Sequence, residues 1–511
     1  MLLTWAGRRV PDDWLGLLCR RVKLPGLQEL WGDLVRLRLP ARVPVLDEDL
    51  MAGVSQWSAT RGRLNEAQWQ KALLPWRSHG SWPLTCSSSG VTSLTTPQSG
   101  TRAGVCPVQH GSPTNPGEPR LSLHTPEFAA DPHRAYRNAR SQYGSLVPME
   151  LAPGVPATLV VGYQTALRIL NDPDHFPADP RTWEQTIPDD APVKPMMMWY
   201  PNALRNAGAA HARYRQAYTA SIDGIDLHAL HSTVEKIAIP VINSFCETGS
   251  ADLITQYALP VVFEVLNQMV GCSAELGQRV ATGMAMLFDT IEAAAGMAML
   301  SEALMELVQL RRADPGDDVT SRMAHHPANL DDTEMLSQLI SFYGAGIEPQ
   351  QNLIINTLLL MLTDDRFGGD VLGGSLSTRD ALDEVLFNDP PMANFGISYP
   401  RQPILIDNTW LPAHQPVVVS LAGCNNDPAI RGGDRTGNRS HLAWSAGPHA
   451  CPAKSVAYLV VQDAIDQLLD ALPEMELAVP AEQLTWRPGP FHRALSALPV
   501  VFPKSPPLPV F

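Results

Sequence analysis

The chain has 511 residues, of which 45% are hydrophobic and 18% are charged, and its formal net charge at pH 7 is −14. This composition is typical of a globular protein that buries a large core. The acidic balance argues against a general binder of nucleic acids or of anionic membranes, so neither is expected as a partner.

Residues 1–105 differ in composition from the rest of the chain. They hold seven of the twelve Trp residues and end in a Ser-, Thr- and Gly-rich stretch, residues 78–104, which is typical of a linker. We interpret residues 1–105 as an N-terminal extension that is poorly ordered or linker-like. The alternative is a small module that binds a partner. Residues 106–511 are then the globular domain.

From Pro107 onward the spacing of apolar residues predicts mostly helices. A short strand over 157–161 and a helix over 165–172 come first. The fold class is expected to be mainly α with small β-sheets, because the strand-like segments are few and short. The later strands are predicted at 403–406, 416–421 and 500–502, and the longer helices at 227–248, 251–270, 275–294, 298–312, 331–363, 380–387 and 455–472.

The cysteines and the apolar runs indicate a cytoplasmic protein. The seven cysteines are scattered and odd in number, which does not suit a disulfide framework and suggests a reducing compartment. The apolar runs are shorter than the roughly 20 residues that a membrane span needs. The first residues also lack the apolar core of a signal peptide.

A segment near the C-terminus is suited to binding a haem iron. It reads WSAGPHACPA from Trp444 to Ala453, and the predicted helix over 455–472 follows it. The N–H groups and dipole of that helix stabilise a thiolate at Cys451 and lower its pKa. Thiolate ligation of a haem iron favours cleavage of the O–O bond. The alternative is a buried structural cysteine.

One predicted helix has an unusual centre. Gly344 and Gly346 remove side chains from one face, so that a flat group can approach the backbone. Pro349 has no N–H, and the Ala345 carbonyl four residues earlier therefore loses its helix partner beside the acid Glu348. We expect a kink over a haem, with a groove for dioxygen. An ordinary proline kink in a core helix is the alternative.

Two further segments supply groups that bind carboxylates such as haem propionates. His211 and Arg215 are four residues apart and share one face of a helix. Arg401 lies in an extended Pro-Arg-Gln-Pro sequence that is suited to presenting a guanidinium inward. The alternative for each of these residues is an exposed, solvated charge.

Taken in order, these segments resemble the cytochrome P450 family over residues 107–511. The family's haem loop has an aromatic residue, a Gly and a Cys at fixed spacing, which Trp444, Gly447 and Cys451 match. Its oxygen-groove helix matches residues 344–351. Further matches are His449 for a residue that contacts a propionate, His211 and Arg215 for the C helix, Arg401 for the Arg after the K helix, and Asn-Asn-Asp-Pro at 425–428.

The sequence departs from the family pattern at two positions that bear on activity. The Glu-x-x-Arg motif of the K helix reads Glu384-Val-Leu-Phe387, so the Arg that normally locks the segment under the haem is absent. The Thr that normally follows the acid in the oxygen groove, and helps to deliver protons, is Pro349. The first departure resembles an actinobacterial branch of the family that lacks the K-helix Arg.

The resemblance implies a haem-thiolate monooxygenase that inserts an oxygen atom from O2 into a small lipophilic substrate. It implies haem b as the cofactor with Cys451 as the axial ligand, and electrons from a ferredoxin and a ferredoxin reductase. Two alternatives are a catalytically degenerate haem-binding sensor or scaffold and a haem-thiolate enzyme of non-hydroxylating oxidation. The expected catalytic residues are Ala345, Gly346, Glu348 and Pro349, and the expected cofactor-binding residues are His211, Arg215, Arg401, His449, Trp444 and Gly447.

Overall fold

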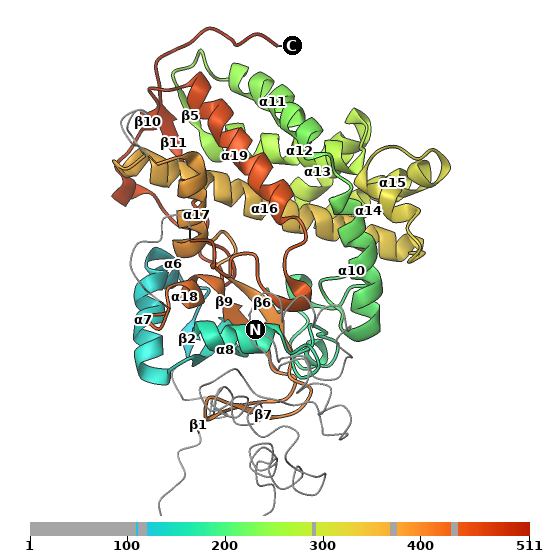
Figure 1. Cartoon of the computed structure of the whole chain (residues 1–511), viewed down its shortest axis with the longest axis vertical. Helices are drawn as coiled ribbons and strands as arrows, with labels where there is room; N and C mark the ends of the chain where they lie inside the picture. Colours follow the sequence, from blue (N-terminus) through green and yellow to red (C-terminus); the bar gives the residue numbers. More distant parts are fainter. Residues whose placement is uncertain (1–108, 111–119, 289–292, 368–375, 431–437, 511) are drawn as a thin grey trace, which may run out of the picture. The chain divides into compact units, whose positions relative to one another are not determined.

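The computed structural model describes residues 109–110, 120–288, 293–367, 376–430 and 438–510, which belong to one compact unit, Gly104–Phe511. The predicted N-terminal extension, residues 1–105, lies outside the described residues. Within the described unit, Figure 1 shows the long helices in its upper part and the largest sheet in its lower part.

A five-stranded sheet joins segments from both ends of the described chain. Its strands are ordered β2-β3-β4-β9-β6, with β4 and β9 parallel at the centre and almost wholly buried. Short helices pack around it (Figure 1). The strands are β2 (Leu121–Ser122), β3 (Leu146–Ala152), β4 (Val155–Val160), β9 (Val417–Ser420) and β6 (Asn394–Ser398), and the helices are α6 (Pro126–Ala130), α7 (Pro132–Tyr143), α8 (Tyr163–Leu170) and α18 (Leu421–Asn425).

Two smaller sheets have three strands each. One is ordered β1-β8-β7 and the other β10-β11-β5. In the second sheet, β11, near the C-terminus, is central and pairs with β10 on one side and with β5, from the middle of the chain, on the other. The strands are β1 (Gln109–His110), β8 (Thr409–Leu411), β7 (Ile404–Ile406), β10 (Glu476–Leu477), β11 (Pro499–Val501) and β5 (Ser250–Asp252).

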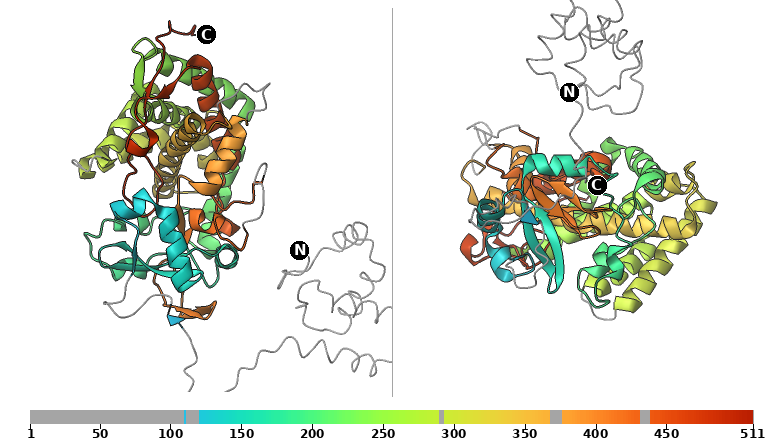
Figure 2. Two further views of the ribbon diagram at one scale, coloured as in Figure 1. Left: turned by 90° about the vertical axis from the view of Figure 1, so that its left-hand side faces the viewer. Right: turned by 90° about the horizontal axis from the view of Figure 1, so that it is seen from below.

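The long helices pack around a shared apolar core (Figures 1 and 2). Tyr257, Tyr343 and Leu353 are among its fully buried members. The helices are α9 (Lys194–Met197), α10 (Gly208–Asp223), α11 (Leu227–Asn243), the π-helical turn η2 (Ile254–Ala258), α12 (Leu259–Val270), α13 (Ala274–Phe288), α14 (Ala293–Ala313), α15 (Val319–Ala324), α16 (Asp332–Thr363), α17 (Thr378–Asn388) and α19 (Lys454–Ala471). Single 3-10 turns are η1 (Trp183–Gln185), η4 (Gly447–His449) and η5 (Ala481–Gln483).

The structure confirms a mainly α fold with small sheets. Several helix ends differ from the prediction: α13 is described to Phe288 and not to residue 294, and α14 begins at Ala293 and not at residue 298. Two further differences concern the helices predicted over 251–270 and 227–248. The helix predicted over 251–270 begins instead with β5 and η2, because residues 250–252 pair with β11. The helix predicted over 227–248 ends at Asn243 and continues as tighter turns, in which the N–H groups of Phe245 and Thr248 donate to carbonyls three residues earlier. Both differences arise from interactions that helical periodicity does not report.

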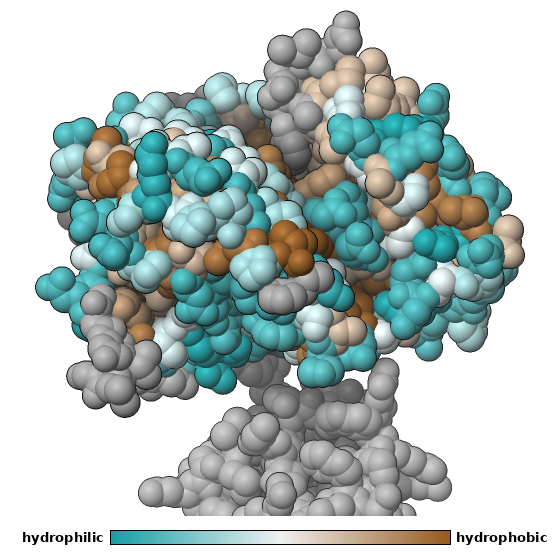
Figure 3. Space-filling model, turned by 90° about the horizontal axis from the view of Figure 1, so that it is seen from above, coloured by the Kyte–Doolittle hydropathy of each residue, from teal (hydrophilic) through white to brown (hydrophobic). Residues whose placement is uncertain are grey.

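No helix in the described ranges is long and apolar enough to cross a membrane. Figure 3 shows one face of the molecule, where hydrophilic side chains cover most of the surface and hydrophobic ones form smaller areas between them.

The long helix α16 runs through the helical core and has a well-defined start. The Asp331 side chain accepts a hydrogen bond from the Glu334 N–H, and the Glu334 carboxylate accepts one from the Asp331 N–H. Arg213 of α10 donates to the same carboxylate over 2.7 and 2.8 Å. These hydrogen bonds lower the pKa of Glu334 to about 2, with Arg213 as the largest cause. The capping box thus connects α16 to α10.

We expect Glu334→Gln to destabilise the fold by about 1 kcal/mol at pH 7, because it removes the carboxylate of the cap and of the ion pair. The folded pKa lies below the ordinary value of 4.5, so the carboxylate stabilises the fold above pH 4.5 and loses this effect as the pH falls toward 2. Denaturant unfolding should therefore show a smaller loss at pH 3 than at pH 7. The exposed Glu474→Gln is the control, and an equal loss for Glu334→Gln at both pH values would contradict the prediction.

Candidate functional site

The loop that carries Cys451, which we call the cysteine loop (residues 444–453), is closed by hydrogen bonds of its own backbone. The Cys451 N–H donates to the Trp444 carbonyl over 2.8 Å, and the Ala450 N–H donates to the Gly447 carbonyl over 3.1 Å. Helix α19 begins three residues after Cys451. The main chain therefore holds this cysteine just before a helix, as the sequence predicts.

Gly447 is required by the contact between this loop and α8. Its φ is +71°, a left-handed conformation that favours glycine. A Cβ at this position would also collide with the carbonyl oxygen of Leu170. Any other residue would have to displace either the loop or the end of α8.

The electrostatic setting of Cys451 combines two opposing effects. The Ala453 N–H donates to the thiol, and the positive charges of Arg215 and Lys454 also favour the thiolate. Burial outweighs these effects and raises the pKa of the Cys451 thiol. The lowered pKa expected from the helix N-terminus is therefore wrong for the cysteine without a metal, because loss of solvent is the larger effect. A metal ion deprotonates a ligating thiol outright, and these donors then stabilise the thiolate.

Three basic residues gather beside the cysteine loop, and we call them the basic cluster (His211, Arg215 and His449). The Arg215 guanidinium donates to the Ala450 carbonyl, which ties α10 to the loop. The rings of His211 and His449 stack, with centroids 4.0 Å apart and planes 34° apart. Burial lowers the pKa of His449 to about 3 and also lowers that of His211. Both rings are therefore neutral at pH 7, and Arg215 supplies the positive charge.

The basic cluster has no acidic partner among the described residues. None of the ion pairs within the described ranges includes a member of it. The buried Nε2 of His211 also has no hydrogen-bond partner there. A buried polar group without a partner costs about 1–3 kcal/mol. The cluster is therefore suited to an anionic ligand.

Arg401 lies outside the basic cluster. Its side chain is exposed in the turn before β7. Burial raises the pKa of Asp179, but hydrogen bonds from Arg181 and, more weakly, the charge of Arg401 lower it overall. The structure thus brings Arg401 near a surface acid and not to the residues that the sequence groups with it.

The centre of α16 is open on one side. Gly344 and Ala345 are exposed although they lie in the middle of a 32-residue helix. A Cβ on Gly344 would have no atom within 4 Å. A Cβ on Gly346, in contrast, would come within 2.9 Å of Leu266 in α12. Gly344 and Ala345 therefore border open space, whereas Gly346 permits close packing between two helices.

Pro349 removes a hydrogen-bond donor from the centre of α16, as the sequence predicts. It cannot donate to the Ala345 carbonyl. One residue further along the helix, the Gln350 side-chain amide donates to the Gly346 carbonyl over 3.1 Å. The open face of α16 therefore carries a carbonyl without its helical partner, and position 349 offers no hydroxyl.

The acid beside Pro349 forms an ion pair with the C-terminal segment. Glu348 accepts a hydrogen bond from Arg487, and the two side chains are 24% and 43% exposed. Their charges also act on the buried His492, whose pKa is lowered chiefly by burial. A titratable group is therefore present next to the open face, but a guanidinium holds its carboxylate.

A polar network that the sequence did not indicate connects α17 to the cysteine loop and supports it. The buried carboxylate of Asp383 in α17 accepts hydrogen bonds from Arg439 and from the Tyr458 hydroxyl, both over 2.7 Å. The ring of Tyr458 lies 5.3 Å from that of Trp444 in the loop. One carboxylate thus connects α17, α19 and the chain that leads into the loop. The sequence directed attention to Glu384, which instead pairs with Arg366 at the surface.

A second link between α17 and the cysteine loop passes through Asn425. Its side-chain amide donates to the Leu386 carbonyl over 3.0 Å, and its oxygen accepts the Leu442 N–H over 2.7 Å. Phe387, which stands where the family has Arg, packs edge-on against His441 with ring centroids 5.2 Å apart. Aromatic packing therefore occupies the position of the missing guanidinium. The only sequence signal for this link was the Asn-Asn-Asp-Pro segment.

These features fit a haem bound through Cys451. The described residues contain no group of three or more His, Cys, Asp or Glu that could hold a metal ion. Cys451 offers one thiol beside a basic cluster, and a haem iron takes one such axial ligand from the protein. The basic cluster provides donors for the haem carboxylates. The fold and this site together define a haem-thiolate protein.

Comparison with known proteins agrees with this class. The cytochrome P450 monooxygenase PikC of Streptomyces venezuelae is 27% identical over 410 residues, which cover 77% of this chain and 96% of the relative. The 6-deoxyerythronolide B hydroxylase of Saccharopolyspora erythraea is 24% identical over 403 residues, which cover 74% of this chain and 98% of the relative. No family model matches the chain.

Solved structures show the same fold. CYP154C4 from Streptomyces sp. W2061 has a TM-score of 0.67 at 25% identity and covers 75% of this chain and 98% of its own. CYP154A1 from Streptomyces coelicolor A3(2) has a TM-score of 0.66 at 24% identity and covers 75% of this chain and 100% of its own. The chain thus has the fold of the cytochrome P450s and resembles them in sequence over about three quarters of its length, and haem b is the cofactor that these relatives bind. Membership of the branch that lacks the K-helix Arg stays a prediction.

We expect Asp383→Asn to loosen the cysteine loop, because it leaves Arg439 without its charged partner while keeping an acceptor for Tyr458. The free energy of unfolding should fall by about 2 kcal/mol. The ferrous-CO complex should also lose its thiolate-type absorption band faster on storage than the wild type does. Glu384→Gln is the matched control, because its exposed pair with Arg366 contributes about 0.5 kcal/mol at most. Equal effects of the two substitutions would refute the role of Asp383.

Proposed function

We propose that the protein is a haem-thiolate monooxygenase that inserts an oxygen atom from O2 into a small lipophilic substrate. The observation that carries this proposal is the cysteine loop, with a single half-buried thiol held by backbone hydrogen bonds beside a basic cluster that forms no ion pair among the described residues. The family comparisons support the same reaction class.

The protein's contribution at the metal side is to fix one thiolate. When bound, the haem supplies the iron chemistry that activates dioxygen, and thiolate ligation favours O–O cleavage. Cys451 would bind the iron, with its sulfur accepting the Ala453 N–H and facing the charge of Arg215. Hydrogen bonds of this kind hold the ligand in place and tune how strongly it donates. The basic cluster would bind the haem carboxylates.

The protein's contribution on the open face of α16 is space and a route for protons. Gly344 and Ala345 leave room beside the helix, which suits a small ligand. Because Pro349 has no hydroxyl, a proton must come from Glu348 or from water hydrogen-bonded to the Ala345 carbonyl. The Arg487 guanidinium donates to the Glu348 carboxylate, so this ion pair must separate or rearrange before Glu348 passes on a proton. We therefore expect proton supply to limit turnover at this site.

The relatives support a small lipophilic substrate. The 2-hydroxy-5-methyl-1-naphthoate 7-hydroxylase of Streptomyces carzinostaticus and the vitamin D(3) 25-hydroxylase of Pseudonocardia autotrophica are each 25% identical to this chain. We infer a substrate of the same general chemistry, bound mainly by apolar contacts. We also place the reaction in the cytoplasm, and the four cysteines in the described ranges are free thiols.

Turnover by the purified holoprotein tests the proposed function. A ferric spectral titration against small lipophilic compounds first selects ligands that shift the spin state. With a ferredoxin, its reductase and NADPH, we expect at least one of these ligands to gain one oxygen atom, as measured by mass spectrometry. Cys451→Ser should lose both the thiolate-type CO band and the product.

Two outcomes would contradict parts of this proposal. If the CO band survives in Cys451→Ser, another cysteine binds the iron. If ligands shift the spectrum but no oxygenated product forms while reductant is consumed, the chain is a haem-binding sensor or scaffold, or it catalyses an oxidation without oxygen insertion.

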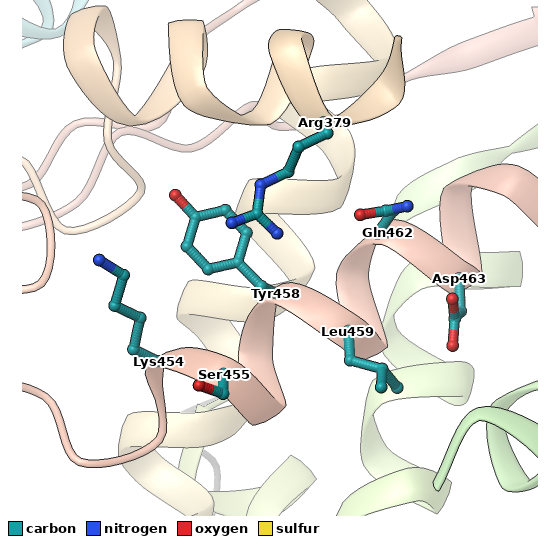
Figure 4. A pocket seen from close by; sticks show the side chains of 7 residues that line it. All are labelled: Arg379, Lys454, Ser455, Tyr458, Leu459, Gln462 and Asp463. Atoms are coloured by element: carbon teal, nitrogen blue, oxygen red, sulfur yellow. The ribbon is translucent and has the colours of Figure 1, made fainter. Parts of the chain in front are cut away.

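We further propose that a ferredoxin donates the electrons at a surface hollow beside the cysteine loop. The hollow has a volume of about 360 Å³ and lies between α17 and the start of α19 (Figure 4). Lys454 is exposed at its edge, three residues from Cys451, and Arg379 stacks on Tyr458 with its charge 3.7 Å from the ring centre. The residues that line it are Arg379, Lys454, Ser455, Tyr458, Leu459, Gln462 and Asp463.

The charges of this hollow suit an acidic partner. Its acidic member, Asp463, is already paired with His231 over 2.8 Å. The half-exposed Arg439 and Arg379 both lie near the carboxylate of Asp383. Positive side chains therefore gather locally on a chain whose net charge is −14. Complementary charge of this kind steers association and sets its salt dependence.

We expect Lys454→Glu to raise the KM for ferredoxin about fivefold to tenfold, because it replaces one attractive charge with a repulsive one. The substrate-induced spin shift should stay unchanged, and the ferrous-CO complex should keep its thiolate-type band, because Arg215 and the Ala453 N–H still favour the thiolate. The effect should shrink between 50 and about 300 mM salt, since salt screens exposed charges. Lys504→Glu, an exposed lysine in the C-terminal segment, is the matched control. Equal KM values for both variants would place the docking surface elsewhere.

A further inference from the structure

Arg205 is a buried guanidinium in a tightly folded segment between α9 and α10. Its side chain is 3% exposed and donates to the Met196 carbonyl over 2.6 Å. The N–H groups of Leu204 and Arg205 both donate to the Asn202 side-chain oxygen over 3.0 Å. These hydrogen bonds to Asn202 therefore fix the backbone at Arg205.

This guanidinium has no acidic partner within the described ranges. No ion pair there includes Arg205, and its ring neighbour is Phe395, 5.6 Å from the charge. The nearby acids are engaged, because Asp179 pairs with Arg181 over 2.5 Å and Glu184 accepts the Trp199 N–H over 2.7 Å. A buried charge without a partner is strongly destabilising. Arg205 is therefore placed for an anion that the chain itself does not supply.

Other unsatisfied polar atoms surround the same region. The buried hydroxyls of Ser398 and Tyr399, at the end of β6, have no hydrogen-bond partner among the described residues, and neither has His211 Nε2. The charge of Arg205 acts on Tyr399 and on His449 of the basic cluster. The anion site is thus bordered by β6, the cysteine loop and the segment before α10.

We propose that Arg205 binds a haem propionate and that the Tyr399 hydroxyl donates to the same carboxylate. This proposal rests on the proposed haem site and extends it to two residues that the sequence did not indicate. Arg205 takes the role expected of Arg401, which is exposed. The recognised chemistry is a carboxylate, and a carboxylate on a substrate is the other possible source. The test separates the two.

The experiment compares haem with haem dimethyl ester, in which the propionate charges are blocked. The full-length protein is loaded with either cofactor, and transfer of the cofactor to excess apomyoglobin is followed by absorbance. We expect Arg205→Met to lose haem about 10- to 100-fold faster than the wild type, as for a buried charge-assisted hydrogen bond. With the dimethyl ester, Arg205→Met and the wild type should transfer at the same rate.

Two further variants keep the test decisive if Arg205→Met folds poorly. Tyr399→Phe removes one hydroxyl and should release haem about threefold to tenfold faster, again with no effect on the ester. Arg137→Met, which removes an exposed guanidinium from α7, is the control and should release haem at the wild-type rate. A thiolate-type CO band in the wild type establishes the haem site independently of these rates.

Three results would overturn the proposal. The first is an equal acceleration with both cofactors, which assigns Arg205 a purely structural role. The second is faster haem loss in Arg401→Met than in Arg205→Met. The third is unchanged haem loss in Arg205→Met combined with loss of the spin shift for carboxylate-bearing ligands, which assigns the anion to the substrate.

Discussion

The cysteine loop depends on one buried carboxylate beneath it. Asp383 is held by Arg439 and Tyr458, and through Tyr458 and Trp444 it connects the helix α17 to the residues that position Cys451. Phe387, which the sequence pattern aligns with the Arg of the family, packs on His441 beside this network.

The second governing feature is an excess of buried positive charge and unsatisfied donors near the loop. The apoprotein bears the cost of keeping these groups out of water without partners. An anionic cofactor removes that cost, so cofactor binding and stability are linked. The same logic explains why burial raises the pKa of the free Cys451 thiol although helix N–H groups and Arg215 oppose it. The charges and donors near the cysteine loop are therefore arranged for the state in which an anionic cofactor is bound.

Patterns within short segments of the sequence predicted much of the secondary structure, whereas contacts between residues far apart in the chain were mostly not predicted. Periodicity predicted α16 to within a residue, and the apolar run after the cysteine loop predicted α19. Strand β5 was missed because its partner, β11, is about 250 residues away. Asp383 and Arg439 are 56 residues apart, and nothing in either neighbourhood marks them as a pair. The sequence directed attention to Arg401, which is exposed, because motif order is visible in a sequence and burial is not.

The C-terminal segment has a consequence for how the protein is made. Arg487 pairs with Glu348 across 139 residues, and Arg493 reaches back to the Ala129 carbonyl across 364. Because α16 is synthesised before the C-terminal segment, it leaves the ribosome before the groups that fix its centre. Removal of the residues from 485 onward would keep the described α-helices but would lose the pair of Arg487 with Glu348 beside the open face of α16.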